Sequence, residues 1–530
     1  QWVKTLIAAG MKGVIFTAKH HDGFCLWPFE GNDYNVSKSP WRGGKGNVVR
    51  ELADACKKYG LKFAVYLSPW DRSRSEYATP DYLPYFYAQL RDLLTNYGEM
   101  FEVWFDGANG GDGYYGGAKD QRTIDRKNYY NYPRIFEILD EIQPNAVVFG
   151  DGGPGCRWVG NEKGFAGETN WSFLRKGEVY PGYPRHTELT YGHADGNQWT
   201  AAECDVSIRP GWFYHPEEDG RVKSPEQLVD LYYRSVGHNA TFLLNFPVDR
   251  DGLIHPIDSA NAIAYHNIIQ RELSNNLVAG MKARVSSERG GQFTAKALTD
   301  NSWDTYWATP DGVTTGDIEF RFKKAQRMNR IMLQEYIPLG QRVKKFSVEY
   351  LDNKGQWQTV EQPEETTTIG YKRLLRFATV VSKGIRVRIL DSRGPLCINN
   401  IGVYDGGKDA QLTWSKAAES IKSLPFTVVK KTADEVIIDL GEAKDITTLQ
   451  YLPDQSDHRK GLVHTYSIST CDANGNVQKT LKKDEFSNIQ NNPILQTVTF
   501  PTVKTRYLKF KAERMVKAGE KMNYEKLGIN

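Results

Sequence analysis

Acidic side chains follow several of the aromatic, apolar segments in the first half of the chain. The segment FEVWFDGANGG, residues 101–111, is an apolar run that ends in Asp106 and then breaks into glycines. Asp-Gly after a strand is ordinary turn chemistry, so a turn is the first interpretation. The second is a catalytic carboxylate at the carboxyl end of a buried strand, and the rest of the chain must separate the two.

Polar and aromatic residues also stand at or near the ends of neighbouring strand-like segments. An aromatic residue taken singly is more often part of the core than of a binding site, and for Asp71 and Asp151 we favour a role in a turn or a helix cap. Carboxylates flanked by aromatic rings and hydrogen-bonding histidines are what glycoside hydrolysis requires, one carboxylate as nucleophile or base and one as acid. The residues at or near these strand ends are His20, His21, Asp22, Tyr66, Trp70, Asp71, Trp104, Asp106, Asp151, Arg157, Trp158, Glu162, Glu203, Asp205 and Trp212.

Metal chemistry is not expected in this group. His20 and His21 are adjacent, and adjacent strand residues point to opposite sides. No third ligand has suitable spacing, so we expect no metal and no cofactor for catalysis. Residues 298–312 bring Trp303, Tyr306 and Trp307 close in sequence to Asp300 and Asp304. We expect core aromatic residues and a structural turn, which could hold Ca²⁺ in a β-sandwich, rather than a sugar site.

Strand-like and helical segments alternate up to about residue 265. Near-continuous apolar strands joined by helices predict a parallel sheet buried on both faces, and the number of units favours a (β/α)8 barrel. A doubly wound open sheet is the alternative, but no glycine-rich phosphate loop follows an early strand. The chain opens in the middle of an amphipathic helix, so the first barrel strand is expected before residue 1. The predicted strands are 13–21, 61–71, 100–107, 145–153, 201–208 and 240–247.

The pattern changes after residue 265 to short alternating strands, which is typical of antiparallel sandwiches. A weak internal repeat is present, because residues 317–336 parallel 435–453 and residues 346–360 parallel 466–480. We therefore predict two similar β-sandwiches in tandem. The predicted domains are a barrel at 1–265, one sandwich at 266–408 and a second sandwich at 409–530.

Composition excludes several classes of protein. A quarter of the 530 residues are charged, but positive and negative charges nearly balance and the formal net charge is only +4. The composition therefore does not indicate a surface that binds nucleic acid. No apolar run approaches the length of a membrane span. The six cysteines are widely spaced without a CxxC pattern, which predicts neither a zinc site nor a disulfide framework.

Six motifs of the barrel region together resemble a known family. KHHDGFCLW, VYLSPWD, EVWFDGANGG, RWVGNE, ECDVSIRPGWFYH and LLNFPVDRDGLIHP are similar to the α-L-fucosidases of glycoside hydrolase family 29. Within this family, the motifs are more similar to the subgroup that cleaves α-1,3/1,4-linked fucose in Lewis-type glycans than to other members. The two trailing domains look like discoidin-type, or F5/8 type C, sandwiches.

This resemblance implies roles for individual residues. Asp106 falls on the family's nucleophile, and Glu162 in the GNE motif on the subgroup's general acid/base, with Glu168 and Glu203 as alternatives. The residues that match the fucose pocket are His20, His21, Trp27, Tyr66, Trp104, Arg157, Trp158 and Trp212.

The implied function is a retaining exo-α-L-fucosidase acting on fucosylated oligosaccharides through a covalent fucosyl-enzyme. The alternative is a catalytically inactive fucose- or glycan-binding protein. The resemblance also implies a secreted or periplasmic location, whereas the oligomeric state is left open.

Overall fold

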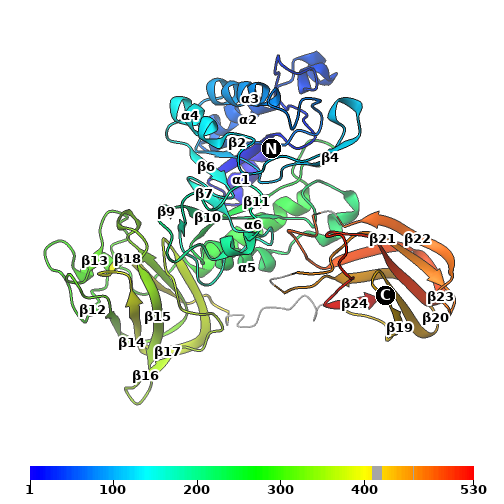
Figure 1. Cartoon of the computed structure of the whole chain (residues 1–530). Helices are drawn as coiled ribbons and strands as arrows, with labels where there is room; N and C mark the ends of the chain where they lie inside the picture. Colours follow the sequence, from blue (N-terminus) through cyan, green and yellow to red (C-terminus); the bar gives the residue numbers. More distant parts are fainter. Residues whose placement is uncertain (409–420, 457–458, 487) are drawn as a thin grey trace. The chain divides into compact units, whose positions relative to one another are not determined.

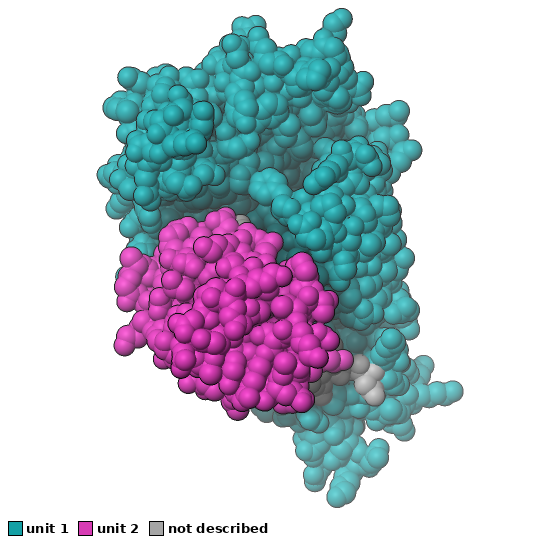
Figure 2. Space-filling view, turned by 90° about the vertical axis from the view of Figure 1, so that its right-hand side faces the viewer, with its two compact units in different colours: residues 1–412 teal, residues 413–530 magenta. Residues whose placement is uncertain are grey.

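The computed structural model describes residues 1–408, 421–456, 459–486 and 488–530. The chain divides into two compact units, residues 1–412 and 413–530, which Figure 2 colours separately. The predicted boundary between the two sandwiches, at residues 408 and 409, adjoins residues 409–420, which lie outside the described residues. Within the described ranges, no helix is both long enough and apolar enough to cross a membrane.

The N-terminal domain is built on one parallel sheet of seven strands whose order in space follows their order in sequence. Each predicted strand is present, and a short one at Cys156–Trp158 was missed. Among the described residues β1 and β11 form no ladder with each other, so the sheet is a half-barrel and not a closed ring. The strands are β1 Gly13–Lys19, β2 Lys62–Leu67, β3 Glu102–Trp104, β6 Val147–Gly150, β7 Cys156–Trp158, β10 Ala201–Ser207 and β11 Ala240–Asn245.

Helices cover the sheet between these strands. Helix α2 begins at Asn47, whose side chain accepts a hydrogen bond from the Arg50 amide, and ends at Gly60 in a left-handed conformation. In Figure 1, α2, α3 and α4 gather over β1–β6, while α5 and α6 pack at the β10–β11 end. The α-helices are α1 Trp2–Ala8, α2 Val48–Tyr59, α3 Tyr82–Asn96, α4 Tyr132–Ile142, α5 Pro225–Ser235 and α6 Pro256–Glu272.

The structure moves the C-terminal border of this domain and adds two hairpins inside it. Helix α6 crosses the predicted boundary at residue 265 and continues to Glu272, which forms an ion pair with Arg330 of the first sandwich. Two small hairpins lie within the long connections of the domain. They are β4 Gly111–Gly113 with β5 Asp120–Arg122, and β8 Phe173–Leu174 with β9 Gln198–Trp199.

The first sandwich is an antiparallel domain with two long, bent strands, β14 and β17, at its centre. Its strand order is β13-β18-β14-β17-β15-β16, with β12 paired to β14. Ile318, Phe346 and Val387 lie in its buried core. The strands are β12 Arg284–Val285, β13 Trp307–Ala308, β14 Gly316–Glu335, β15 Val343–Leu351, β16 Trp357–Thr359, β17 Arg373–Ser392 and β18 Cys397–Tyr404.

The second sandwich repeats this topology, as the sequence repeat predicts, except that β13 has no counterpart among its described strands. Its strand order is β19-β20-β23-β21-β22, with β24 paired to β20. Corresponding hairpins even close with the same turn, in which the carboxylates of Asp352 and Asp472 each accept from backbone amides two and four residues later. The strands are β19 Thr427–Lys431, β20 Glu435–Leu452, β21 Val463–Cys471, β22 Val477–Glu485, β23 Gln496–Met515 and β24 Lys526–Ile529.

The segment considered for Ca²⁺ differs in part from its predicted form. Trp307 is buried in the first sandwich as expected, but the Trp303 side chain is 64% exposed and does not belong to the core. The carboxylate of Asp300 accepts from the Ser302 amide and the Thr305 hydroxyl, which makes a structural turn. A structural Ca²⁺ in a sandwich stays a prediction.

Candidate active site

Asp106 lies just beyond β3, where the carboxyl ends of the parallel strands meet. The Tyr66 hydroxyl donates to its Oδ2 at 2.8 Å, and the Ala108 amide donates to its Oδ1 at 2.7 Å. The following residue, Gly107, has no room for a side chain, because a Cβ there would lie 2.3 Å from Asp151 Oδ1. The WFDG motif thus fixes a carboxylate whose side chain is still 24% exposed.

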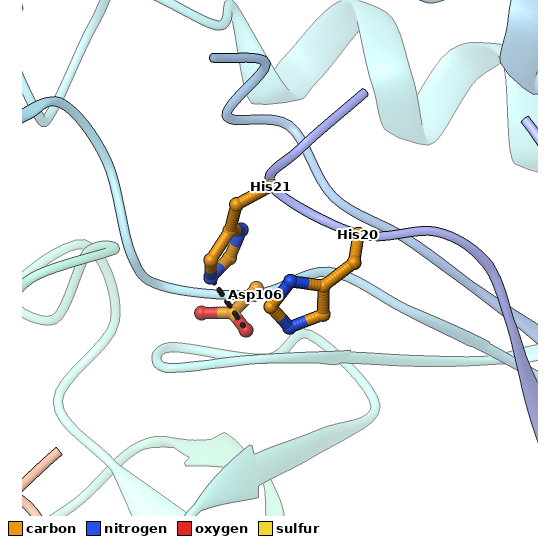
Figure 3. A group of neighbouring side chains, drawn as sticks. All are labelled: His20, His21 and Asp106. Atoms are coloured by element: carbon orange, nitrogen blue, oxygen red, sulfur yellow. Dashed lines mark ion pairs between the residues drawn. The ribbon is translucent and has the colours of Figure 1, made fainter. Parts of the chain in front are cut away.

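The two histidines lie beside this carboxylate (Figure 3). They follow the last residue of β1, so the alternation of side chains along a strand does not apply and both rings converge, with centroids 4.1 Å apart. His21 Nε2 lies 3.7 Å from Asp106 Oδ2, and His21 Nδ1 is 2.7 Å from Ser68 Oγ. The prediction that His20 and His21 point to opposite sides is therefore wrong.

One atom from each of His20, His21 and Asp106 can be chosen so that all three lie within 4.8 Å of one another, a spacing that could hold a metal ion. Absence of a catalytic metal stays a prediction. The alternative use of these atoms is direct contact with the hydroxyls of a sugar.

The charge states of these groups suit a nucleophilic carboxylate. Burial lowers the pKa of His20 to about 4 and also lowers the pKa of His21, so both rings are neutral near pH 7. Burial alone would raise the pKa of Asp106. His21, the Ala108 amide, His20 and the Tyr66 hydroxyl outweigh that effect and hold the pKa of Asp106 below its ordinary value. The carboxylate is therefore ionised, as a nucleophile must be.

Trp104 forms the floor beneath the nucleophile. Its indole stacks on Phe149 with ring centroids 3.9 Å apart and on Tyr66 at 5.1 Å. Its Nε1 donates to Glu203 Oε1 at 2.9 Å, and the Thr241 hydroxyl donates to Glu203 Oε2 at 3.0 Å. Glu203 is buried with both oxygens engaged, which fits a support for Trp104 better than a general acid.

Glu162 lies in the loop after β7, under the side chain of Trp212. The indole Nε1 of Trp212 donates to Glu162 Oε2 at 2.8 Å. The next residue, Phe213, packs edge-on against His20 with ring centroids 5.3 Å apart. Burial raises the pKa of Tyr66 well above its ordinary value, and both Asp106 and Glu162 contribute to the rise. Glu162 is thus linked through Trp212 and Phe213 to His20, which lies beside Asp106.

Trp158 belongs to the same region, whereas Glu168 does not. Trp158 Nε1 donates to Asp205 Oδ1 at 3.0 Å, and the pKa of Asp205 is raised by burial and by the charge of Glu162. Glu168 Oε2 instead accepts from the backbone amide of Glu365 in the first sandwich at 2.7 Å. Glu162 and Glu168 are both half-buried and Glu203 is buried, but of these three acids only Glu162 is half-buried and also bonded to another residue of the site, Trp212.

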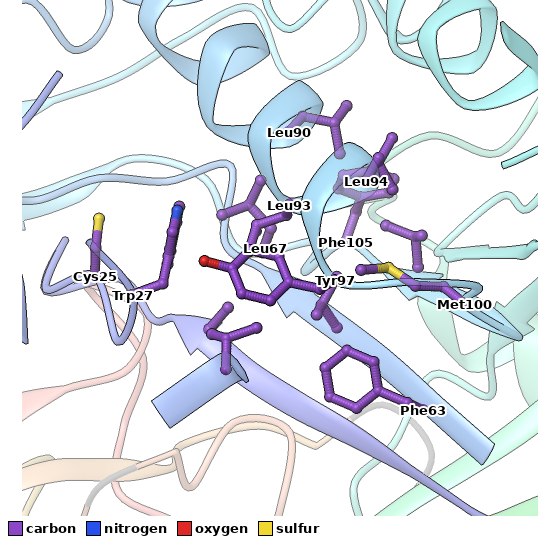
Figure 4. Close-up of a cluster of buried hydrophobic side chains, with 14 of the residues drawn as sticks. Cys25, Trp27, Phe63, Leu67, Leu90, Leu93, Leu94, Tyr97, Met100 and Phe105 are labelled. Carbon is purple, nitrogen blue, oxygen red and sulfur yellow. The ribbon is translucent and has the colours of Figure 1, made fainter. Parts of the chain in front are cut away.

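Two predicted substrate contacts are corrected by the structure. Trp27 is fully buried among the core side chains beside α3, and its Nε1 donates to Asp92 Oδ2 at 2.7 Å (Figure 4). Arg157 is also fully buried, and its guanidinium donates hydrogen bonds to the Leu189 and Thr200 carbonyls and to Asn170 Oδ1. Neither side chain is available to a sugar.

Asp71 has a structural role beside the site, and two further aromatic residues lie next to the histidines. Asp71 accepts from the Ser73 amide at 3.0 Å and forms a buried ion pair with Lys19, which is the structural role favoured for it. Trp70 packs against His21 with centroids 5.0 Å apart. Trp70 was noted at a strand end but given no role in the fucose pocket, and Phe213 was missed although the motif RPGWF contains it.

Comparisons with known proteins agree with this geometry. The family model described as alpha-L-fucosidase matches residues 1–264, and the F5/8 type C domain model matches residues 282–401 and 403–525. Alpha-L-fucosidase 1 of Arabidopsis thaliana is 40% identical over 415 residues, which cover 76% of this chain and 78% of that protein.

Solved structures give the same result. A glycoside hydrolase 29 family member from an unknown rumen bacterium is 41% identical with a TM-score of 0.69, and the match covers 100% of this chain and 90% of that one. A Ruminococcus gnavus GH29 fucosidase in complex with fucose is 33% identical with a TM-score of 0.66, covering 77% of this chain and 85% of that one. On this identity, coverage and agreement of models, the chain belongs to the α-L-fucosidase family of glycoside hydrolases.

Proposed function

We propose that this protein is a retaining exo-α-L-fucosidase that removes terminal α-1,3/1,4-linked L-fucose from Lewis-type oligosaccharides. The observation that carries the proposal is a pair of carboxylates held among the same histidine and aromatic side chains. Asp106 is ionised and fixed by donors to both oxygens, while Glu162 is held by Trp212. Two such carboxylates are the groups that retaining hydrolysis needs.

In the first step an Asp106 oxygen attacks the anomeric carbon of fucose. The bond from that carbon to the leaving oxygen breaks, and Glu162 gives its proton to this oxygen. His20 and His21, both neutral, are suited to hydrogen bonds with sugar hydroxyls, since each neutral ring has one donor and one acceptor nitrogen. The products are a covalent fucosyl-enzyme and the released oligosaccharide.

In the second step water attacks the same carbon. Glu162, now a carboxylate, takes the proton from water, and the bond to Asp106 breaks. Each step inverts the anomeric centre, so two steps retain it. The tryptophan and phenylalanine rings near the histidines offer apolar surface to the C–H groups and methyl group of fucose.

The linkage preference rests on the resemblance to the Lewis-cleaving subgroup, which also puts the acid/base in the GNE motif that contains Glu162. The family resemblance supports a secreted or periplasmic location. A mechanism without metal or cofactor fits the chemistry of the family, in which the two carboxylates carry the reaction.

The test is hydrolysis of matched substrates by the full chain. A Lewis trisaccharide and 2′-fucosyllactose are incubated separately, and released fucose is quantified while NMR follows the first anomer formed. We expect faster cleavage of the Lewis trisaccharide, poor activity on simple aryl fucosides, and α-L-fucose as the first product. Preference for 2′-fucosyllactose would refute the linkage, and β-L-fucose as the first product would refute retention. Binding without hydrolysis would favour the glycan-binding alternative.

A further inference from the structure

Glu162 belongs to a loop that joins β7 to β8 without a helix, residues 159–172, here called the acid/base loop. The first part of this loop folds around the buried Asn161 side chain. Its Nδ2 donates to the carbonyls of Val159 and Phe165, and its Oδ1 accepts from the Lys163 amide at 3.0 Å. The middle of the loop is anchored on the N-terminal domain, because the Ala166 amide donates to the Arg234 carbonyl and the Gly167 amide to the Thr190 carbonyl, each at 3.0 Å.

The second part of the acid/base loop is anchored on the first sandwich by Gln341. The Ser172 amide donates to Gln341 Oε1 at 2.8 Å, and Gln341 Nε2 donates to the Asn170 carbonyl at 2.8 Å. One side chain thus satisfies a donor and an acceptor of the loop backbone, much as a neighbouring strand would. Gln341 is only 2% exposed, so water cannot replace it.

Further bonds fix the preceding residues of the loop. The Asn170 amide donates to Thr368 Oγ1 at 2.8 Å, and the Glu365 amide donates to Glu168 Oε2 at 2.7 Å. The Glu168 carbonyl accepts from Arg373 Nη1 at 2.9 Å. The contacts come from two segments of the sandwich, Gln341 and residues 365–373, so the loop is held at more than one point.

Buried charges make this surface costly to separate. Arg373 pairs with Glu364 at 2.9 Å, and Glu364 is 3.0 Å from His238 of the N-terminal domain, whose other ring nitrogen is 3.0 Å from the Ala166 carbonyl. Burial opposes the charge on Glu364, but His238 and Arg373 outweigh it and lower its pKa to about 2. Removing either charged member of the Arg373–Glu364 pair would leave the other buried charge uncompensated.

We propose that the first sandwich is a working part of the active site, because Gln341 and Thr368 hold the acid/base loop and thereby position Glu162. The inference rests on the proposed role of Glu162 as general acid/base. Gln341 and Thr368 are positioning residues that act through the loop, and they touch no substrate. A misplacement of a catalytic group by about 1 Å can cost about 100-fold in rate.

The experiment uses the full chain with Gln341→Ala and Thr368→Val, each of which removes side-chain bonds to the loop backbone. Ser382→Ala is the matched control, because Ser382 is equally buried in the same sandwich and bonds only within it, to Leu351 and Gly384. Values of kcat/KM are measured on a Lewis trisaccharide, which needs an acid, and on α-L-fucosyl fluoride, whose leaving group needs little help.

We expect both variants to lose about tenfold or more on the trisaccharide and less than about threefold on the fluoride, with Ser382→Ala changing both substrates alike. Equal losses on both substrates, or no loss in a variant shown to be folded by circular dichroism, overturn the proposal. Glu162→Gln measured in parallel separates the two failures. If that variant shows no leaving-group dependence, the assigned acid/base and this inference fall together; if it does and the sandwich variants do not, this inference alone falls.

Discussion

The Tyr66 hydroxyl donates a 2.8 Å hydrogen bond to Oδ2 of Asp106, and the Tyr66 ring at the same time stacks on Trp104. The nucleophile's orientation is therefore set by a residue of the neighbouring strand, which is itself held by the aromatic floor. A carboxylate bound in this way cannot rotate freely, and its ionised form is favoured over the protonated one.

Tyr66→Phe tests this relationship, because it removes the hydroxyl and keeps the ring that stacks on His20 and Trp104. A hydrogen bond to a charged group contributes about 1.5–3 kcal/mol, so kcat/KM should fall by about 10- to 100-fold. The hydroxyl lowers the pKa of Asp106. Its loss should raise that pKa and move the acidic limb of the kcat/KM profile to higher pH. An unmoved acidic limb would contradict the role given to Tyr66.

Glu162→Gln should abolish the proton donor for natural linkages. General acid catalysis contributes about 10²–10⁴-fold, so kcat/KM on a Lewis trisaccharide should fall by that amount, while kcat/KM on α-L-fucosyl fluoride changes little. Glu168→Gln is the control, because its amide oxygen can still accept from Glu365, and it should behave as wild type on both substrates. The opposite pattern, with the loss in Glu168→Gln, would transfer the role to Glu168.

Glu203→Ala should weaken the floor under the nucleophile. The variant leaves the buried Trp104 Nε1 without its acceptor, which costs about 1–3 kcal/mol of unfolding free energy, and it should also slow turnover. Glu203→Gln keeps an acceptor oxygen and should retain most of the stability. Urea denaturation followed by tryptophan fluorescence measures both. A Glu203→Ala variant as stable as Glu203→Gln would show that this bond does not support Trp104.

Asp151 makes stability depend on pH. Burial raises its pKa from the ordinary 3.8 to about 7, so the folded state binds this proton more tightly than the unfolded chain. The stability it contributes, about 4 kcal/mol, is complete below about pH 4 and lost as the pH rises to about 7. Melting temperatures at about pH 5 and about pH 7.5 should therefore differ more for wild type than for Asp151→Asn. The control is Asp311→Asn, at a side chain that is 92% exposed. If wild type and Asp151→Asn changed in parallel, Asp151 would not be the titrating group.

The sequence was sufficient to place the groups that lie at strand ends. Asp106, His20 and Tyr66 were found because apolar strands end at fixed points and parallel strands bring those ends together. The tandem sandwiches were likewise visible, since the hairpins around Asp352 and Asp472 repeat in sequence and in structure.

Other features depend on partners that are distant along the chain. Trp27 and Arg157 resemble pocket residues in sequence, but Asp92 and the Leu189 and Thr200 carbonyls occupy their polar atoms. Nothing in the local pattern shows which donor meets which acceptor. The bonds from Gln341 to the acid/base loop span about 170 residues for the same reason.

The central claim is that Asp106 becomes covalently bonded to fucose, and trapping that intermediate tests it most directly. A 2-deoxy-2-fluoro-fucosyl fluoride should react with the full chain, because the fluorine at C2 slows both formation and breakdown of the intermediate, whereas the reactive fluoride leaving group speeds its formation only, so that the intermediate accumulates. Peptide mass spectrometry should then find one deoxyfluorofucosyl group on Asp106, and Asp106→Ala should take up none. A label on a different carboxylate, or full turnover by Asp106→Ala, would contradict the account.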